Sequence, residues 1–251
     1  MFALFALYPL LSIVSAALAP PGQVPAFLPT DITWGNFAEA WDLGRFGTYL
    51  RTSAVVSTSV VVLATVFSVM AGYAFGTMHF RGSAVLFYVL LLGIMVPTEA
   101  IVVPLFFDLR DIGLTNTLLA LVLPQTAQSV AFGTFWMRAY FRSSSRAMVE
   151  AARIDAAWHW RTLWSVLLPI GRPAMITMIV LVFMWTWNEF LIPLVMVTDE
   201  SLRTAPLGLA FFQGQYTADF GLLAAGAAIV ATPVVVVYLF LQRHFIRGMV
   251  E

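Results

Sequence analysis

The chain has 251 residues, of which 61% are hydrophobic and only 10% are charged, and its formal net charge is zero. Soluble domains carry about 25% charged residues, so this composition is typical of a protein embedded in a membrane. The zero net charge gives no reason to expect a nucleic-acid partner, and the absence of cysteine excludes disulfides, thiolate chemistry and cysteine-bound metals.

All 13 basic residues are arginine, and no lysine occurs in the chain. The phosphate-binding motif G-x-x-x-x-G-K-[ST] needs its lysine on the β- and γ-phosphates of the nucleotide. The chain therefore has no ATP site of that kind, and Schiff-base chemistry on a lysine is excluded as well.

Six stretches are long and apolar enough to cross a membrane, which takes about 20 mostly apolar residues. Their apolar runs are continuous rather than alternating, so each predicts a helix and not a strand of a barrel. They lie at about Phe2–Ala19, Ser53–Phe75, Ala84–Phe106, Thr117–Tyr140, Ala174–Val197 and Gly221–Leu241. The predicted fold class is all-α, a polytopic bundle of six transmembrane helices.

The arginines indicate the orientation, because cytoplasmic connections are usually enriched in basic residues. With a cytoplasmic N-terminus, nine arginines fall inside: Arg81, Arg138, Arg142, Arg146, Arg153, Arg161, Arg172, Arg243 and Arg247. Only Arg45, Arg51, Arg110 and Arg203 fall outside. We therefore expect a multi-pass protein with both termini in the cytoplasm.

The first stretch allows two interpretations. It ends in "IVSAALAP", which has the small-residue pattern of a signal-peptidase site, but no basic segment precedes it. We expect a retained helix, because an even number of spans keeps the arginine-rich loop and tail on one side, and we expect a short basic leader before it. The following loop, Pro20–Tyr49, is either a cap that touches an external partner or a linker lying on the membrane.

Glycine and proline inside the spans predict close packing and kinks. "GYAFG" (Gly72–Gly76) is a G-x-x-x-G motif, which lets two helix backbones approach closely, and we expect it to pack within the bundle. Prolines at Pro97, Pro104, Pro124 and Pro193 suggest helix kinks around a cavity.

The segment "EAARIDAAWHWRTLWSVLLPIGRP" (Glu150–Pro173) is charged and rich in tryptophan, unlike its surroundings. Trp160, Leu163, Trp164 and Leu167 have the i, i+3, i+4, i+7 spacing of one helix face. The segment predicts two short helices, broken near residues 156–157, on the cytoplasmic side. Two interpretations remain open: an amphipathic helix at the membrane surface, or a docking surface for a soluble partner.

"EAARIDAA" followed by "LLP" resembles the EAA loop of ABC-importer permeases. The matching residues are Glu150, Ala151, Ala152, Asp155, Leu168 and Pro169. Ala156 replaces the usual glycine, which would permit a positive φ at a helix break. "WTWNEFLIPLVMVTDESLRTAPLGLAFFQGQY" and "LQRHFIRG" resemble the carbohydrate-uptake branch of this family, the maltose and glycerol-phosphate type. The resemblance covers about residues 51–248.

The resemblance implies a type I ABC-importer permease in a bacterial inner membrane, carrying a sugar or sugar-like solute. Such a permease is not an enzyme and binds no cofactor, because ATP-Mg is held by a partner ATPase. The implied partners are a second permease subunit in a heterodimer, two ATP-binding subunits, an extracytoplasmic solute-binding protein and membrane lipid. Expected domains are residues 1–50, a transport domain at 51–245 with a coupling loop at about 141–172, and a tail at 246–251.

Four polar residues inside spans are candidates to line the substrate path: Glu99, Gln128, Asn188 and Glu189. An acid at the centre of a span costs about 2.5–3.5 kcal/mol on insertion scales, so it calls for a reason. The alternative is a structural role, either at the outer membrane surface or in interhelical hydrogen bonds, which also applies to Gln125. The three histidines lack ligand spacing, so we expect no metal site.

Two other function classes are weighed against an ABC permease. A channel or secondary carrier that works without ATP would leave the charged cytoplasmic segment unexplained. A membrane-embedded enzyme would need a catalytic constellation, but the sequence has no Ser/His/Asp arrangement, no HExxH motif and no paired acids.

Overall fold

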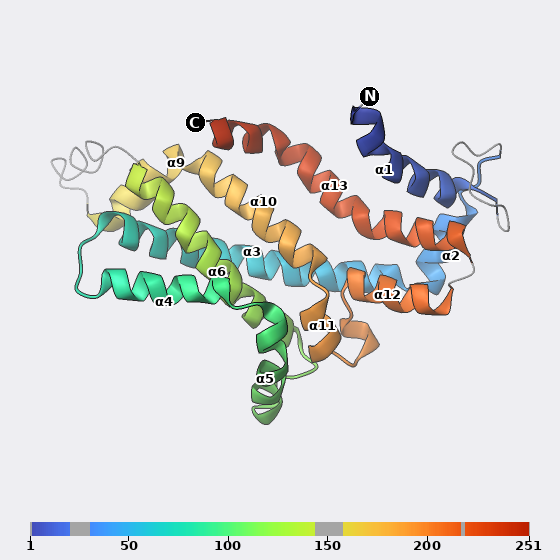
Figure 1. Cartoon of the computed structure of the whole chain (residues 1–251), viewed down its shortest axis with the longest axis horizontal. Helices are drawn as coiled ribbons and strands as arrows, with labels where there is room; N and C mark the ends of the chain where they lie inside the picture. The colour runs from blue at the N-terminus through green and yellow to red at the C-terminus, as the bar shows by residue number, and fades with distance from the viewer. Residues whose placement is uncertain (1, 21–30, 144–157, 217–218, 251) are drawn as a thin grey trace.

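Every element in the described part of the chain is helical (Figure 1). The computed structural model describes residues 2–20, 31–143, 158–216 and 219–250. The elements are α1 (Phe2–Leu18), α2 (Gly35–Leu43), α3 (Phe46–Thr77), α4 (Ser83–Met95), α5 (Thr98–Asp111), α6 (Leu118–Ser143), α8 (His159–Arg161), the π-helical turn η1 (Thr162–Leu167), α9 (Leu168–Ile170), α10 (Arg172–Asn188), α11 (Leu191–Met196), the 3₁₀ turn η2 (Glu200–Leu202), α12 (Ala205–Gln215) and α13 (Phe220–Val250).

Three of these helices, α3, α6 and α13, are each long and apolar enough to cross a membrane. Two bent pairs bring the number of spans to as many as five: α4 with α5, and the His159–Ile170 segment with α10. Helix α1 has 17 residues, which is short for a span. The all-helical membrane fold predicted from the sequence is therefore confirmed, with three to five candidate spans.

The third predicted span, Ala84–Phe106, is not one continuous helix. It is broken into α4 and α5, whose axes differ by 98°, and α5 projects away from the body of the molecule (Figure 1). The cause is Pro97, which holds the residue before it, Val96, in an extended conformation (φ −78°, ψ 119°) and ends α4.

The fifth predicted span, Ala174–Val197, is also interrupted. Helix α10 ends at Asn188, Glu189 is extended (φ −64°, ψ 125°), and α11 begins two residues later. Pro193, the third residue of α11, has no N–H to donate to the Glu189 carbonyl four residues before it, and its ring would clash with that carbonyl in a continuous helix. The Glu189 carboxylate accepts a hydrogen bond of 3.0 Å from the Ile192 N–H, so it satisfies a free donor at the start of α11.

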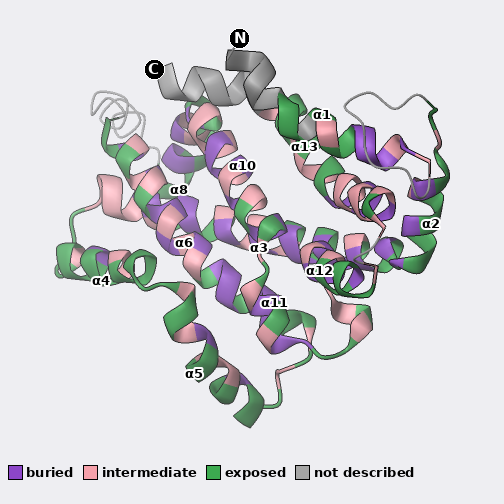
Figure 2. Cartoon of the chain, turned by 45° about the vertical axis from the view of Figure 1, so that its right-hand side comes forward, coloured by how far each residue is buried: buried purple, intermediate pink, exposed green. Residues whose placement is uncertain are grey.

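Helices α3 and α6 share the most extensive contact among the described elements. A Cβ atom added at Gly72 would lie 2.6 Å from the Met137 Cβ, and one added at Gly76 would lie 2.9 Å from the Phe141 Cβ. The prediction that the G-x-x-x-G motif packs within the bundle is confirmed. Buried residues gather along α3, α6 and α10, whereas α4 and α5 are largely exposed (Figure 2).

The last part of the predicted coupling loop, residues 158–170, partly departs from the single amphipathic face expected for it. Leu163 and Leu167 are buried, but Trp160 and Trp164 are exposed, with their ring centroids 5.5 Å apart. The turn is π-helical, and its i→i+5 hydrogen bonds change the register, so the two leucines and the two tryptophans face different surroundings. The break expected at residues 156–157 lies outside the described residues.

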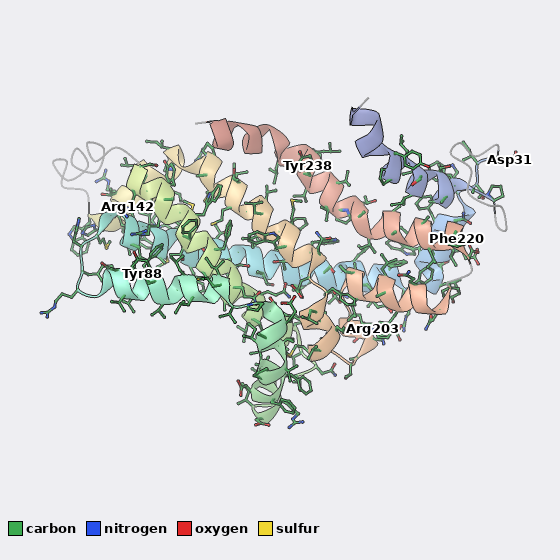
Figure 3. The ribbon with its side chains drawn as sticks, viewed as in Figure 1. Asp31, Tyr88, Arg142, Arg203, Phe220 and Tyr238 are labelled. Carbon is green, nitrogen blue, oxygen red and sulfur yellow. The ribbon has the colours of Figure 1, made fainter. Side chains whose placement is uncertain are left out.

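Two charged residues lie at opposite ends of the molecule. Figure 3 shows Arg142 at one end of the elongated molecule and Asp31 at the other. Arg142 belongs to the last turn of α6, whereas Asp31 precedes α2.

Candidate translocation pocket

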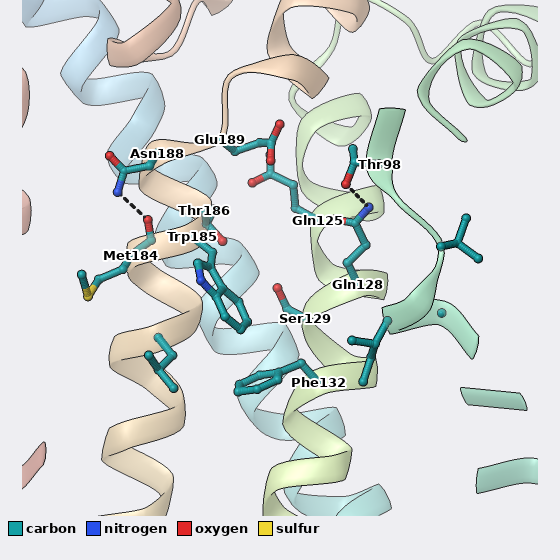
Figure 4. Close-up of a pocket in the computed structure, with 14 residues that line it drawn as sticks. Thr98, Gln125, Gln128, Ser129, Phe132, Met184, Trp185, Thr186, Asn188 and Glu189 are labelled. Carbon is teal, nitrogen blue, oxygen red and sulfur yellow. Dashed lines mark hydrogen bonds between the residues drawn. The ribbon is translucent and has the colours of Figure 1, made fainter. Parts of the chain in front are cut away.

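A pocket of about 490 Å³ lies between α6, the end of α10 and the junction of α4 with α5 (Figure 4). Both helix breaks contribute to its wall: Val96 and Thr98 come from the first break, and Asn188 and Glu189 from the second. Non-helical backbone at membrane depth is tolerated where it lines a cavity or is buried in protein. The interruptions of α4–α5 and α10–α11 therefore belong to the construction of this pocket.

Two helix faces form its long walls. Gln125, Gln128, Ser129 and Phe132 on α6 have the i, i+3, i+4, i+7 spacing of one face. Leu181, Met184, Trp185 and Asn188 on α10 have the same spacing. The pocket is thus built from two parallel stripes, one mainly polar and one mixed.

The side-chain amide nitrogens that line the pocket all donate hydrogen bonds to other groups of the protein. Gln125 Nε2 donates to the Leu121 carbonyl at 2.9 Å, and Gln128 Nε2 donates to Thr98 Oγ1 at 3.2 Å. Asn188 Nδ2 donates to the Met184 carbonyl at 2.7 Å. Gln125 is only 4% exposed, and its Oε1 has no hydrogen-bond partner among the described residues.

Glu189 supplies the pocket's single charge, since the lining includes no arginine. Its side chain and that of Gln125 extend toward one another from α10 and α6 (Figure 4). One carboxylate oxygen is held by the Ile192 N–H. The Glu189 carboxylate and the Gln125 oxygen together make the polar end of the pocket rich in hydrogen-bond acceptors.

The opposite end is aromatic. The rings of Phe132 and Trp185 meet edge to face, with centroids 4.6 Å apart, and Trp185 is 52% exposed. An exposed aromatic face beside polar acceptors suits a ligand that has both apolar and hydroxylated surfaces.

Of the four residues expected along the substrate path, the pocket brings together Gln128, Asn188 and Glu189. Glu99 is not in the lining: it is exposed in the first turn of α5, beyond the 98° bend. Thr98, Ser129, Phe132 and Trp185 also line the pocket and were not predicted from the sequence. Ser129 lies four residues after Gln125, Phe132 four after Gln128 and Trp185 three before Asn188, and this helical spacing was the available signal.

The predicted ATPase-coupling residues are only partly described. Glu150, Ala151, Ala152, Asp155 and Ala156 lie outside the described residues. Leu168 is half-buried and Pro169 is exposed, both in α9. Within the residues that the structure covers, no group of three or more histidine, aspartate or glutamate side chains gathers as metal ligands would.

Comparisons with known proteins identify the family. The family model described as "Binding-protein-dependent transport system inner membrane component" matches residues 64–251. The diacetylchitobiose uptake system permease NgcG of Streptomyces coelicolor is 32% identical over 249 residues, which cover 97% of this chain and 82% of that protein. The arabinooligosaccharides permease AraQ of Halalkalibacterium halodurans is 32% identical over 254 residues, covering 98% of this chain and 90% of that protein.

A solved structure is similar along nearly the whole chain. It is the crystal structure of a bacterial ABC transporter involved in the import of the acidic polysaccharide alginate, with a TM-score of 0.81 and 26% identity, covering 97% of this chain and 92% of that one. The chain therefore belongs to the binding-protein-dependent transport system inner membrane components: it is a multi-pass inner-membrane permease subunit of an ABC importer and not a catalytic subunit.

Proposed function

We propose that this permease carries an uncharged sugar or oligosaccharide and that the pocket between α6 and α10 is part of its path. The observation that carries the proposal is the pairing, in one pocket, of an acceptor-rich end at Gln125 and Glu189 with the exposed ring of Trp185 at the other end. Sugar hydroxyls can donate to these oxygens, and the apolar faces of a sugar ring can pack on the indole. Relatives named for diacetylchitobiose and arabinooligosaccharides support the same substrate class.

The sequence and the pocket support a transporter in which this chain works with other subunits, each with a separate role. The chain contributes half of the path, a second permease the other half, and an extracytoplasmic binding protein delivers the solute. Two ATP-binding subunits carry ATP-Mg and dock on the loop that contains Glu150–Asp155, with Leu168 and Pro169 at its end. Ala156 takes the glycine position of this loop.

For the membrane topology we propose six spans with both termini in the cytoplasm. Helix α1 and the outer loop (residues 1–50) precede a transport domain at about 51–245, and residues 246–251 form a tail. The unequal distribution of arginine and the separation of Arg142 from Asp31 support this arrangement. Because the chain lacks cysteine, Ser144→Cys provides a test: labelling from the cytoplasmic side is expected, and labelling from outside would contradict the topology.

The test of function is uptake by the reconstituted complex. The two permeases, the ATPase and the binding protein are placed in proteoliposomes, and ATP-dependent entry of a labelled neutral oligosaccharide is measured. Gln125→Leu and Trp185→Ala should each lower uptake roughly tenfold while the complex still assembles, because each removes a contact of about 1–1.5 kcal/mol. Gln213→Leu, at an exposed position of α12 outside this pocket, is the matched control and should transport normally.

Two outcomes of the uptake experiment would contradict the proposal. Uptake that continues without the ATPase would identify an ATP-independent channel or carrier. ATP-driven uptake that is unaffected by both pocket variants would place the path elsewhere in the complex.

A further inference from the structure

The last part of the predicted coupling loop, residues 158–170, is embedded in the bundle. Thr162, Leu163 and Leu167 are each at most 2% exposed, and the two leucines belong to the same core cluster as residues of α3, α6 and α10. A segment packed in this way cannot move without the helix ends around it, because protein interiors are close-packed.

One side-chain pair links the beginning of this segment to α3. The hydroxyl of Tyr73 lies 3.3 Å from Nδ1 of His159, and the two rings meet edge to face with centroids 6.4 Å apart. Tyr73 is 4% exposed, so its position is fixed by packing, whereas His159 begins α8, inside the predicted coupling loop. The hydrogen bond forms with either histidine tautomer, because the phenol can donate or accept.

The same tyrosine contacts α6. Its ring meets that of Phe141 edge to face, with centroids 5.8 Å apart, and Phe141 also packs against Gly76 of α3. Tyr73 is therefore the point at which α3, α6 and α8 meet.

The far end of the segment is attached to α6 as well. Trp136 Nε1 donates to the Ala174 carbonyl at 2.9 Å, which joins α6 to the first turn of α10. A Cβ atom added at Gly171 would lie 2.6 Å from the Tyr140 ring, so the turn before α10 also touches α6 closely.

Helix α6 then connects this region with the pocket. Phe141 lies 13 residues after Gln128 on the same helix, which corresponds to about 20 Å at a rise of 1.5 Å per residue. A displacement applied at His159 would pass through Tyr73 and Phe141 to a rigid helix whose other part lines the pocket.

We infer that the Tyr73–His159 contact is a positioning joint that transmits the ATPase-driven movement of the coupling loop to α3 and α6. The inference rests on the proposed function, because it takes the loop around Glu150 as the docking site of the ATPase. It adds that the movement enters the bundle through these two side chains, in addition to the covalent connection with α10. Neither residue touches the solute or ATP.

The experiment measures coupling separately from docking. Complexes containing Tyr73→Phe, His159→Phe or both substitutions are reconstituted with the second permease, the ATPase and the binding protein. The readouts are the amount of ATPase retained, the ATP hydrolysis stimulated by the binding protein, and the number of sugar molecules transported per ATP hydrolysed. Tyr88→Phe removes a hydroxyl from an exposed tyrosine of α4 and is the matched control.

If the Tyr73–His159 contact transmits the movement, the variants should change the sugar-to-ATP ratio in a specific way. Each single variant should retain the ATPase but transport roughly two- to tenfold less sugar per ATP, which corresponds to the loss of one hydrogen bond. The double variant should lose no more than either single variant, because both remove the same interaction. His159→Asn, whose amide oxygen stands near the place of Nδ1, should restore part of the ratio when Tyr73 is present and none of it in Tyr73→Phe.

Other results would overturn the inference. An unchanged sugar-to-ATP ratio in both single variants, or losses that simply add in the double variant, would show that the two side chains act independently. If the variants lowered the amount of assembled complex but left the sugar-to-ATP ratio unchanged, the Tyr73–His159 pair would have only a structural role. If the wild-type complex itself moved no sugar with ATP, the proposed function would fail, which is a separate outcome.

Discussion

The hydroxyl of Tyr49 donates a hydrogen bond of 2.9 Å to Glu200 Oε1, although the two residues are 151 positions apart in the sequence. Arg45 adds an ion pair of 3.1 Å with the other carboxylate oxygen. Beside them, Ser53 Oγ accepts the Ala205 N–H at 2.8 Å. The connection between α11 and α12 is therefore fastened to the first turns of α3, at the end that we propose faces outward.

Glu200→Gln should loosen this connection. The hydrogen bond from Tyr49 and then the charge of Arg45 lower the pKa of the Glu200 carboxyl. A lowered pKa in the folded state means that the contribution to stability is present above the ordinary carboxylate pKa, about 4.3, and is lost as the pH falls through the lowered value. The contact should therefore hold throughout the neutral range.

Hydrogen exchange of the amides at 197–204, corrected for the intrinsic effect of pH, measures this contact. In the wild type, exchange should stay slow at neutral pH and accelerate only below the ordinary carboxylate range. In Glu200→Gln it should already be faster at pH 7. Asp111→Asn, which changes an exposed acid paired only with its neighbour Arg110 at 3.8 Å, is the control. Equal exchange in the Glu200 variant and the wild type would contradict the role of the carboxylate.

Gly133→Ala should destabilise the bundle where α3, α6 and α10 meet. A Cβ at this position would overlap Ser68 Oγ and lie 2.9 Å from Met178 Sδ. Overpacking of this kind costs about 1–3 kcal/mol, so the melting temperature in detergent should fall by several degrees. Gly214→Ala, in α12 with nothing within 4 Å of the added atom, is the matched control. Equal melting temperatures for the two variants would contradict this packing.

The helices were predictable from the sequence, and the prolines indicated kinks, but the sequence did not show which kinks would become full breaks. Long apolar runs identify α3, α6 and α13 because the membrane requires each to satisfy its own backbone. Proline was an ambiguous signal, since Pro97 ends a helix whereas Pro104 and Pro124 lie inside α5 and α6. The break at Glu189 lies four residues before Pro193, where a kink was expected, whereas the contact of its carboxylate with the Ile192 N–H was not predictable from the sequence.

The lining of the pocket was likewise only partly predictable from the sequence. Gln128, Asn188 and Glu189 were identifiable as polar residues in apolar spans, and all three line it. Glu99 met the same criterion, but the bend before α5 carries it out of the lining, and no local pattern predicts a 98° change of direction. Trp185 and Phe132 look like ordinary core residues until the two helix faces are placed opposite one another.

Glu189→Gln should impair uptake, whereas Glu99→Gln should have a smaller effect. Glu189 lines the pocket and caps α11, and the amide keeps an oxygen for the Ile192 N–H but removes the charge. Loss of a charge-assisted contact with a hydroxylated ligand corresponds to a fall of roughly tenfold or more. Initial uptake rates at matched amounts of assembled complex provide the measurement. Full activity of Glu189→Gln would leave the acid with a structural role.

The pocket should also disfavour acidic saccharides. Its lining carries the charge of Glu189 and no arginine, so a uronate would meet a like charge at short range in a medium of low dielectric. Binding of a neutral oligosaccharide and of its uronate counterpart to the purified complex can be compared by calorimetry. The neutral ligand should bind more tightly, and Glu189→Gln should narrow the difference. Tighter binding of the uronate by the wild type would contradict the proposed preference.

Glu150→Ala should weaken docking of the ATPase more than folding. Glu150 begins the predicted cytoplasmic helix, where an acid complements the positive end of the dipole. We expect its side chain to project from the cytoplasmic face, so its replacement should cost docking more than folding. A carboxylate projecting into the cytoplasm can however pair with basic or amide groups of a soluble subunit. The variant should therefore reach the membrane in normal amounts, retain less ATPase in a pull-down and lose ATP-driven uptake. Glu39→Ala, on the short helix α2 that we expect outside, is the control and should retain the ATPase fully. Normal ATPase retention together with full uptake by Glu150→Ala would refute the docking role of this residue.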